Sequence, residues 1–159
     1  MLPIHTILFP TDFSPASQTA FVLACALARD YQARLVVLHV MEPPRANFGE
    51  LGPVYPVPGE MRAELEAALG QLKPVGGPVS MERRVVEGAP VGTIVDVARQ
   101  LPAELIVLGT HGRRGIGRVL MGSVAENVLR QAPCPVLAVR SPLPEALVQN
   151  DPRLAEAGV

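Results

Sequence analysis

The sequence of 159 residues has no tryptophan, few aromatic residues (4%) and few charged residues (18%), and Lys73 is its only lysine. Its net charge of -1 argues against broad binding to nucleic acids or anionic membranes, because both attract clustered positive charge. Charged or turn-forming residues interrupt every apolar run before it reaches membrane-spanning length. We therefore expect a cytoplasmic protein that binds neither nucleic acid nor membrane.

The residues that usually carry redox or metal chemistry are also scarce. Cys25 and Cys134 are far apart and form no Cys-x-x-Cys motif, so we expect both to be packing thiols in a reducing compartment. His5 and His39 fall within expected strands, which indicates structural roles. No partner for His111 can be identified that would make a catalytic or metal-binding cluster. We therefore predict no catalytic and no metal-binding residue.

Hydrophobic residues make up 48% of the chain, enough for the core of one domain. Periodicity and turn residues predict strands over 4–9, 34–40, 79–86, 105–108 and 135–140, and helices over 15–30, 60–72, 88–101 and 123–131. Alternating strands and helices pair in parallel through right-handed crossovers. The prediction is a single doubly wound α/β domain (Rossmann-like or flavodoxin-like) over residues 1–140, with a five-stranded parallel sheet and four helices.

Two segments lack a clear pattern. Residues 41–59 contain five prolines and three glycines, so we expect no regular structure there. Residues 141–159 are spaced by prolines, and we expect a loosely held C-terminal tail.

A glycine-rich, cationic segment follows the strand expected at 105–108. Its glycines are Gly109, Gly112, Gly115, Gly117 and Gly122, and its arginines are Arg113, Arg114 and Arg118. Ser123 and Glu126 have the spacing of a capping box, which predicts that a helix begins at Ser123. A strand, a glycine-rich loop and a helix N-terminus in this order suit a phosphate group, since free backbone N–H groups and positive potential converge there.

Two standard phosphate-binding motifs do not fit this segment. A P-loop needs Gly-Lys-Ser/Thr, but Met121 precedes Gly122-Ser123. The dinucleotide-binding pattern fails because Gly115-Ile-Gly117 has no third glycine at the required spacing. A solvated loop followed by a well-capped helix remains the alternative interpretation.

The spacing Gly109-x-x-Gly112, nine residues, then Gly122-Ser123 resembles the nucleotide-binding signature of the universal stress protein family, in its ATP-binding branch. The resemblance extends from Ile4 to about Arg140. It implies the strand order 3-2-1-4-5 and a crevice between strands one and four, where ligands bind at the carboxyl ends of such sheets. It also implies bound ATP, with or without Mg²⁺. The nucleotide-binding residues that it implies are Pro10, Thr11, Asp12, Val40, Leu108, Gly109, His111, Gly112, Arg113, Gly122, Ser123, Val124 and Ala125.

Several of these residues have an expected role, and for Asp12 and Val40 there is also a structural alternative. Asp12 could accept hydrogen bonds from ribose hydroxyls or help to hold a metal, or it could be a turn aspartate. Val40 would offer backbone contacts to adenine, or it could belong to the core. The segment that begins at Gly122 would hold phosphates through N–H groups and the Ser123 hydroxyl. Of Arg113 and Arg114, at most one would reach a terminal phosphate, because adjacent side chains point in different directions.

Two functions fit these residues. The first is a nucleotide-dependent regulator of a stress response, which acts on a protein partner that the sequence does not identify. The second is a slow ATPase or phosphotransferase that uses the same site with Mg²⁺, since phosphoryl transfer needs mainly positioning and charge neutralisation. The absent P-loop lysine and the absence of an obvious base favour the first.

The last expected strand predicts assembly. In the implied order it lies at the sheet edge, and Val136–Val139 carry no charge that would block strand addition. The resembled family dimerises through its last strand, so we expect a two-fold homodimer built on these residues. The alternative is that the tail, residues 141–159, folds back and covers this edge.

Overall fold

The computed structural model describes residues 3–43, 47–49, 52–54, 58–110, 122–151 and 154. Its main sheet has five parallel strands in the order β5-β2-β1-β6-β7. The strands are β1 (Thr6–Pro10), β2 (Arg34–Met41), β5 (Met81–Glu87), β6 (Leu105–Gly109) and β7 (Val136–Val139). The predicted parallel sheet and its order 3-2-1-4-5 are confirmed, with strand ends that differ by one or two residues.

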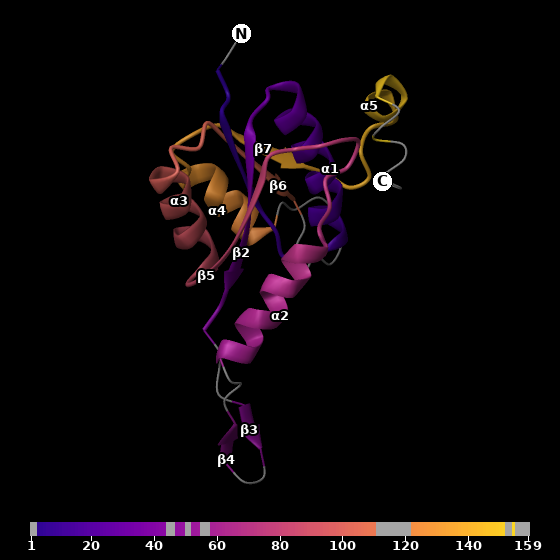
Figure 1. The fold of residues 1–159 in the computed structure, drawn as a ribbon. Helices are drawn as coiled ribbons and strands as arrows, with labels where there is room; N and C mark the ends of the chain where they lie inside the picture. The colour runs from indigo at the N-terminus through magenta and orange to yellow at the C-terminus, as the bar shows by residue number, and fades with distance from the viewer. Residues whose placement is uncertain are drawn as a thin grey trace.

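Helices cover both faces of this sheet (Figure 1). They are α1 (Pro15–Asp30), α2 (Pro58–Gln71), α3 (Pro90–Gln100) and α4 (Ser123–Gln131). The apolar residues of α1 and α2 pack with one set of strand side chains, and those of α3 and α4 pack with the other set. The sheet is therefore the middle layer of three, as expected of a doubly wound domain.

Alternation along β1 shows why this strand is central. Ile7 and Phe9 belong to the α1-side cluster, Leu8 belongs to the α3–α4 side, and all three are completely buried. A strand covered on both faces needs an uninterrupted apolar sequence, which residues 7–9 supply. Burial of each such side chain stabilises the fold by about 1.5–3 kcal/mol.

The N-terminus of α1 forms as its sequence predicts. The Ser14 hydroxyl accepts a hydrogen bond from the Ser17 N–H at 3.2 Å, and Pro15 occupies the first helical position. Proline is suited to that position because its missing N–H would have no intrahelical partner. The start of α1, and therefore the exit of the chain from β1, is fixed locally.

The two edges of the sheet differ in charge. Four of the seven residues of β5 are charged, whereas β7 has the sequence Val-Leu-Ala-Val. On the β5 side, Arg62 of α2 donates to the Val85 carbonyl at 3.0 Å. Arg83 donates to the carbonyls of Leu69 and Leu72, at the end of α2, at 2.9 and 2.6 Å. The edge strand β5 is thus tied to its covering helix by arginine side chains.

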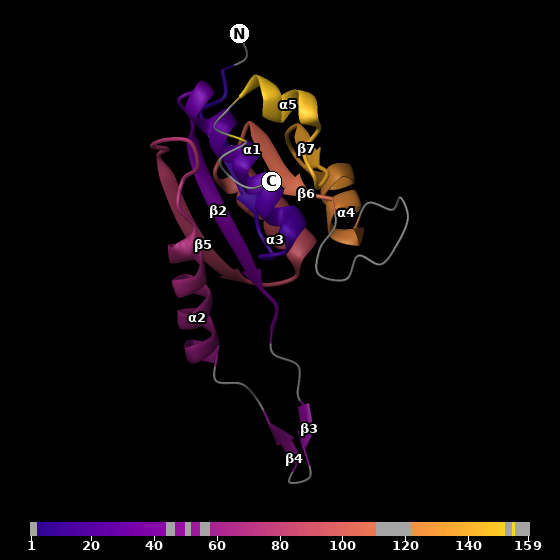
Figure 2. The same cartoon turned by 90° about the vertical axis from the view of Figure 1, so that its right-hand side faces the viewer.

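The prediction of no regular structure over residues 41–59 was wrong. Two short antiparallel strands, β3 (Asn47–Gly49) and β4 (Gly52–Val54), form a hairpin that projects beyond the carboxyl end of the sheet (Figures 1 and 2). Proline is tolerated in a two-stranded ribbon because both strands are edges, and Pro53 lies opposite Phe48 in this register. Gly49 and Gly52 form the last pair of this ribbon.

The C-terminal tail is also more ordered than predicted. It contains a fifth helix, α5 (Glu145–Asn150), so the expected number of four helices was one too few. Leu143 and Leu154 are buried in the cluster on the α1 side, and the hydroxyls of Thr19 and Ser141 share a hydrogen bond of 3.0 Å. These leucines, separated by prolines and polar residues, anchor the tail without any helical periodicity that the sequence would reveal. Among the described residues, no helix has the length and apolar character needed to cross a membrane.

Candidate functional site

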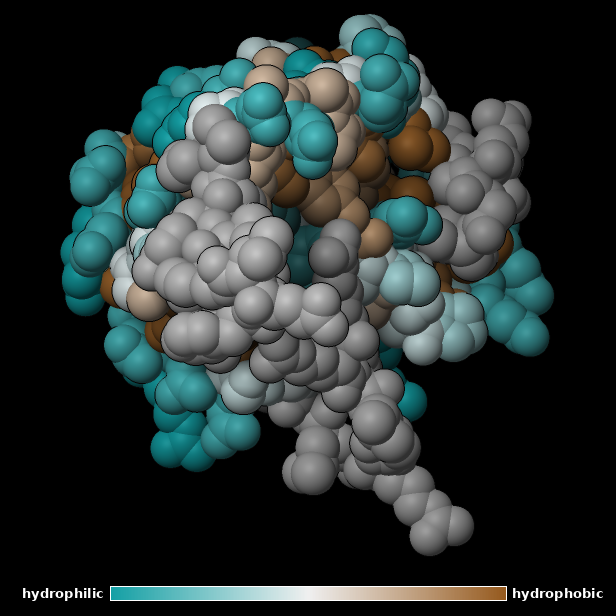
Figure 3. All heavy atoms as spheres, turned by 90° about the horizontal axis from the view of Figure 1, so that it is seen from below, coloured by the Kyte–Doolittle hydropathy of each residue, from teal (hydrophilic) through white to brown (hydrophobic). Residues whose placement is uncertain are grey.

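The carboxyl end of the sheet brings together four predicted site segments. β1 pairs with β2 on one side and with β6 on the other. After β1 the chain enters α1 on one face of the sheet, and after β6 it continues to α4 on the other face. The ends of these strands and the start of α4 carry Pro10 to Asp12, Val40, Leu108 to Gly109 and Gly122 to Ala125. Such a switch point is where ligands bind in open α/β sheets. Figure 3 views the molecule from this end, with hydrophilic residues (teal) along the rim and a group of apolar residues (brown) in the upper part of the view.

Hydrogen bonds hold the turn after β1. The buried Thr11 donates its N–H to the Leu38 carbonyl at 2.8 Å, and its hydroxyl lies 2.8 Å from the Ser17 hydroxyl. One carboxylate oxygen of Asp12 accepts the Ser14 N–H at 3.0 Å. The turn-aspartate interpretation is therefore correct for one oxygen of Asp12. Because the side chain is only half-buried, the carboxylate stays partly open to solvent.

Gly109 has a structural role that the sequence interpretation missed. A Cβ at this position would lie 2.8 Å from the carbonyl carbon and oxygen of Ala16 and 2.9 Å from the Ser17 nitrogen. Real side chains do not approach backbone atoms so closely, so only glycine lets β6 pack against the first turn of α1. A glycine at a strand end indicates a close approach in general, but the sequence does not indicate that α1 is the approaching element.

The start of α4 differs from the predicted capping box. Gly122 is the N-cap, Ser123 is the first helical residue, and the described residues provide no side-chain capping bond. Glu126 instead accepts a hydrogen bond from Arg130 at 2.9 Å. The N–H of Gly122 donates to the Thr110 carbonyl, and Gly122 is the N-cap, so Ser123 lies at the first helical position instead of capping the helix. The predicted helix start at Ser123 is confirmed, but the predicted capping box of Ser123 and Glu126 was wrong.

Within the described part of the chain, no side chain caps the first turn of α4. Ser123 and Val124 are exposed, whereas Ala125 is buried against the sheet. The first N–H groups of a helix have no intrahelical acceptor, and they carry positive potential. The predicted segment therefore presents a hydroxyl and backbone donors at the carboxyl end of the sheet.

The remaining predicted residues form the walls or lie outside the described chain. Pro10 and Val40 are half-buried, and Val40 packs against the α3–α4 side of the core. Leu108 is buried beside Ala138 of β7. The structure does not describe residues 111–121, so His111, Gly112 and Arg113 lie outside the described residues.

The two thiols fit the predicted packing role. Burial raises the pKa of Cys25, and neither the Val75 backbone nor the Arg29 charge offsets this effect. Burial also raises the pKa of Cys134, and the charge of Glu104 raises it further. Both therefore stay protonated at neutral pH, where a thiol is a poor nucleophile and metal ligand. The described residues contain no group of three histidines, cysteines or carboxylates that could hold a metal ion.

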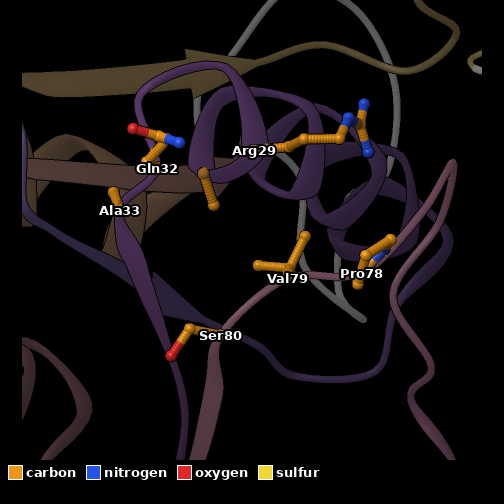
Figure 4. Close-up of a pocket in the computed structure, with 7 residues that line it drawn as sticks. Arg29, Gln32, Ala33, Pro78, Val79 and Ser80 are labelled. Atoms are coloured by element: carbon orange, nitrogen blue, oxygen red, sulfur yellow. The ribbon is translucent and has the colours of Figure 1, made fainter.

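A shallow cavity of about 310 Å³ lies at the opposite, amino end of the sheet (Figure 4). It is lined by the end of α1 and by the segment before β5, through Ala28, Arg29, Gln32, Ala33, Pro78, Val79 and Ser80. The Arg29 side chain extends away from Gln32 and donates to the Val75 carbonyl at 2.9 Å. Its guanidinium thus holds the loop before β5 and is not directed at the cavity.

Comparison with known proteins identifies the family. Residues 3–140 match the universal stress protein family, which is most of the chain. The chain belongs to the universal stress protein family. A universal stress protein of Methanocaldococcus jannaschii is 34% identical over 142 residues, covering 87% of this chain and 84% of the relative. One of Thermus aquaticus is 34% identical over 136 residues, covering 85% and 98%.

Solved universal stress proteins share the fold. UspA of Lactobacillus plantarum superposes with a TM-score of 0.72 at 30% identity, covering 88% of this chain and all of that one. A universal stress protein in complex with cAMP gives a TM-score of 0.64 at 29% identity, covering 87% and 98%. A universal stress protein from Archaeoglobus fulgidus in complex with dAMP, at 22% identity and a TM-score of 0.60 over 87% and 99%, shows the same fold.

Proposed function

We propose that this universal stress protein binds ATP in the crevice between the β1 turn and the start of α4, and that it acts as a nucleotide-dependent regulator of a stress response. The observation that supports this most is the convergence of Asp12, Val40 and the open N-terminus of α4 at the switch point of the sheet. A relative of known structure at 29% identity binds cAMP, which supports an adenine nucleotide as the ligand.

The proposed roles follow the positions of the residues. Pro10 and Thr11 would shape the wall, Asp12 would face the ribose, and the backbone at Val40 would contact adenine. The N–H groups of Ser123, Val124 and Ala125 and the Ser123 hydroxyl would bind phosphates, whose charge the helix N-terminus stabilises. His111, Gly112 and Arg113 would complete the phosphate side, as the motif spacing suggests. Mg²⁺ would arrive with the phosphates, where it neutralises charge.

A regulator reports its nucleotide state to a partner, so binding is the step that matters and rapid turnover is not required. We propose that the protein acts in the cytoplasm, where ATP is abundant and two unpaired thiols stay reduced. Hydrolysis measured with and without Mg²⁺ separates a regulator from an ATPase. A steady turnover that needs Mg²⁺ and is lost in Gly122→Val would favour the enzyme.

The test of ATP binding uses the absence of tryptophan. With two tyrosines as the main chromophores, the protein absorbs weakly near 280 nm, so bound adenine would dominate its near-ultraviolet spectrum. Calorimetric titration with ATP, ADP, AMP and cAMP then ranks the ligands. We expect ATP to bind, and the absence of heat and of co-purified nucleotide for all four would contradict the proposal.

We further propose a two-fold homodimer through β7. The edge strand has no charged residue, Leu137 is 37% exposed, and among the described residues no backbone group of the tail bonds to β7. The tail instead packs on the α1 side through Leu143 and Leu154. A second β7 would satisfy the outer N–H and C=O groups of the strand.

Light scattering tests the dimer. We expect the wild-type protein to be dimeric and Leu137→Lys to be monomeric with ATP binding retained, because a buried ammonium group opposes the interface. A matched control is Leu147→Lys on α5, which is also exposed and should stay dimeric. A monomeric wild type at tens of micromolar, or a dimeric Leu137→Lys variant, would contradict this interface.

A further inference from the structure

The turn after β1 contains a strained residue beside a histidine of β2. Phe13 has a φ of 61°, in the left-handed region that bulky side chains avoid. Its ring stacks on the imidazole of His39, with centroids 4.8 Å apart and an angle of 29° between the planes. Strained conformations persist where the surroundings determine them, and they concentrate at binding sites. The stacking on His39 therefore helps to hold Phe13 in this conformation, and with it the turn after β1.

His39 also fixes the residue before Asp12. Its Nδ1 lies 2.8 Å from the Thr11 carbonyl oxygen, and a carbonyl only accepts, so Nδ1 carries the proton and donates. The hydroxyl of Thr11 accepts the Phe13 N–H at 3.1 Å. The residues on both sides of Asp12 thus contact the same imidazole, Thr11 through its carbonyl and Phe13 through its ring.

The position of His39 in β2 connects the two proposed walls of the crevice. Val40, the proposed adenine contact, is the next residue in the same strand. The histidine therefore ties the turn that carries Asp12 to the strand that carries Val40. A nucleotide that spans both walls needs them at a fixed separation, and small displacements of positioned groups weaken binding.

We propose that His39 is a positioning residue of the nucleotide site: its imidazole sets the place of the Asp12 carboxylate relative to Val40 through Thr11 and Phe13. The inference rests on the proposed function, because it assigns His39 to the same crevice. It changes the interpretation of His39 from a strand residue with a purely structural role to one that acts on ligand affinity through Asp12.

The test is a double-mutant cycle on ATP affinity, measured by calorimetry. His39→Phe keeps a ring for Phe13 to stack on but removes the donor to Thr11, and we expect ATP affinity to fall about fivefold. If His39 acts through Asp12, the variant that carries both His39→Phe and Asp12→Ala should bind ATP as well as Asp12→Ala alone, within about twofold. Losses that add in full would overturn the positioning role.

Controls separate this role from a general loss of structure. His39→Asn can still donate from near the Nδ1 position, so it should retain more affinity than His39→Phe. His5→Phe changes the exposed histidine at the opposite end of the sheet, and ATP affinity should not change. Thermal unfolding establishes that each variant is folded, and Phe13→Ala removes the stacking from the other side and should also weaken binding.

The outcomes distinguish the two proposals. A wild-type protein that binds no adenine nucleotide overturns the proposed function and this role with it. A wild-type protein that binds ATP, beside a folded His39→Phe variant with unchanged affinity, overturns the role of His39 alone.

Discussion

The chain is held in different ways at the two ends of the central sheet. At the amino end, the Glu104 carboxylate accepts the N–H groups of His5 and Thr6 at 3.1 and 2.7 Å, on a surface where its side chain is 37% exposed. At the carboxyl end, the chain is held by a close backbone approach at Gly109 and a positive φ at Phe13. Positive φ also occurs at Gln32 near the amino end, so the ends differ mainly in packing: an exposed carboxylate holds one, and a contact too close to admit a side chain holds the other.

The difference indicates where the molecule tolerates change. An exposed hydrogen-bonded carboxylate adds a small increment of stability and can be replaced at small cost. The close backbone contact at Gly109 leaves no room for an added side chain. We therefore expect substitutions at the carboxyl end to act strongly, on binding or on folding, and substitutions at the amino end to act weakly and only on stability.

The largest effect is expected for Gly122→Val. A valine side chain would occupy space at the N-terminus of α4 where phosphate oxygens are proposed to bind, and valine is a poor N-cap. ATP affinity should fall by more than about 3 kcal/mol of binding free energy, beyond detection by calorimetry, while circular dichroism stays that of the wild type. Loss of helical signal together with binding would show that Gly122 is required for folding instead.

Gly109→Ala should have the next largest effect, on stability. Its Cβ would lie 2.8 Å from backbone atoms of α1, so the free energy of unfolding should fall by roughly 2 kcal/mol, as overpacking does. Gly92→Ala in α3 is the matched control, because nothing lies within 4 Å of its Cβ and alanine favours helices. Urea titration should show opposite signs for the two variants, and a neutral Gly109→Ala would contradict the close packing.

Asp12→Ala should weaken ATP binding by about 1–2 kcal/mol, since it removes one or two charge-assisted hydrogen bonds to the ribose. The variant also loses the bond to the Ser14 N–H, so Asp12→Asn, which can keep that bond, is the control for the turn. Calorimetry should give weaker binding for both variants. Equal affinity in Asp12→Ala and wild type would remove Asp12 from the site.

The smallest effect is expected at the amino end, for Glu104→Gln. Partial burial raises the pKa of Glu104, but the N–H groups of Thr6 and His5 more than offset this, and the pKa lies below its ordinary value. The ionised carboxylate therefore adds stability above the ordinary carboxyl pKa, and this stability is lost as pH falls through the lowered pKa. The variant should lose about 0.5–1 kcal/mol at pH 7, after allowance for solvent screening.

Chemical denaturation across pH tests this assignment. The stability difference between wild type and Glu104→Gln should shrink as the pH falls below about 4. ATP affinity at pH 7 should be that of the wild type. A difference that persists in acid would mean that Glu104 acts through packing rather than charge.

The carboxyl end also shows which features a sequence can predict. The strands, their parallel pairing and the start of α1 follow from local patterns, since apolar runs and Ser14-Pro15 act within a few residues. The strand order required the family resemblance. The segments Pro10 to Asp12 and Gly122 to Ala125 were predicted at the same edge, and the structure brings them there.

The features that could not be predicted depend on contacts between distant residues. Gly109 meets Ala16, 93 residues away, and His39 meets Thr11, 28 residues away. The hairpin β3–β4 lies in a proline-rich stretch whose composition argues against strands, and α5 is held by leucines outside its own short helix. The capping box failed because Gly122, whose N–H donates to the Thr110 carbonyl in a tertiary contact, is the N-cap in place of Ser123.

The unequal charge of the two sheet edges limits the size of any assembly. A sheet with two open edges has two sites for strand addition, so each added molecule exposes a fresh edge and growth continues as a fibre. In the main sheet, β5 carries four charged residues and is tied to α2 by Arg62 and Arg83, which leaves β7 as the edge of that sheet without charge. A sheet with a single edge open to strand addition can pair once, and the paired sheet then has no such edge left at which to grow.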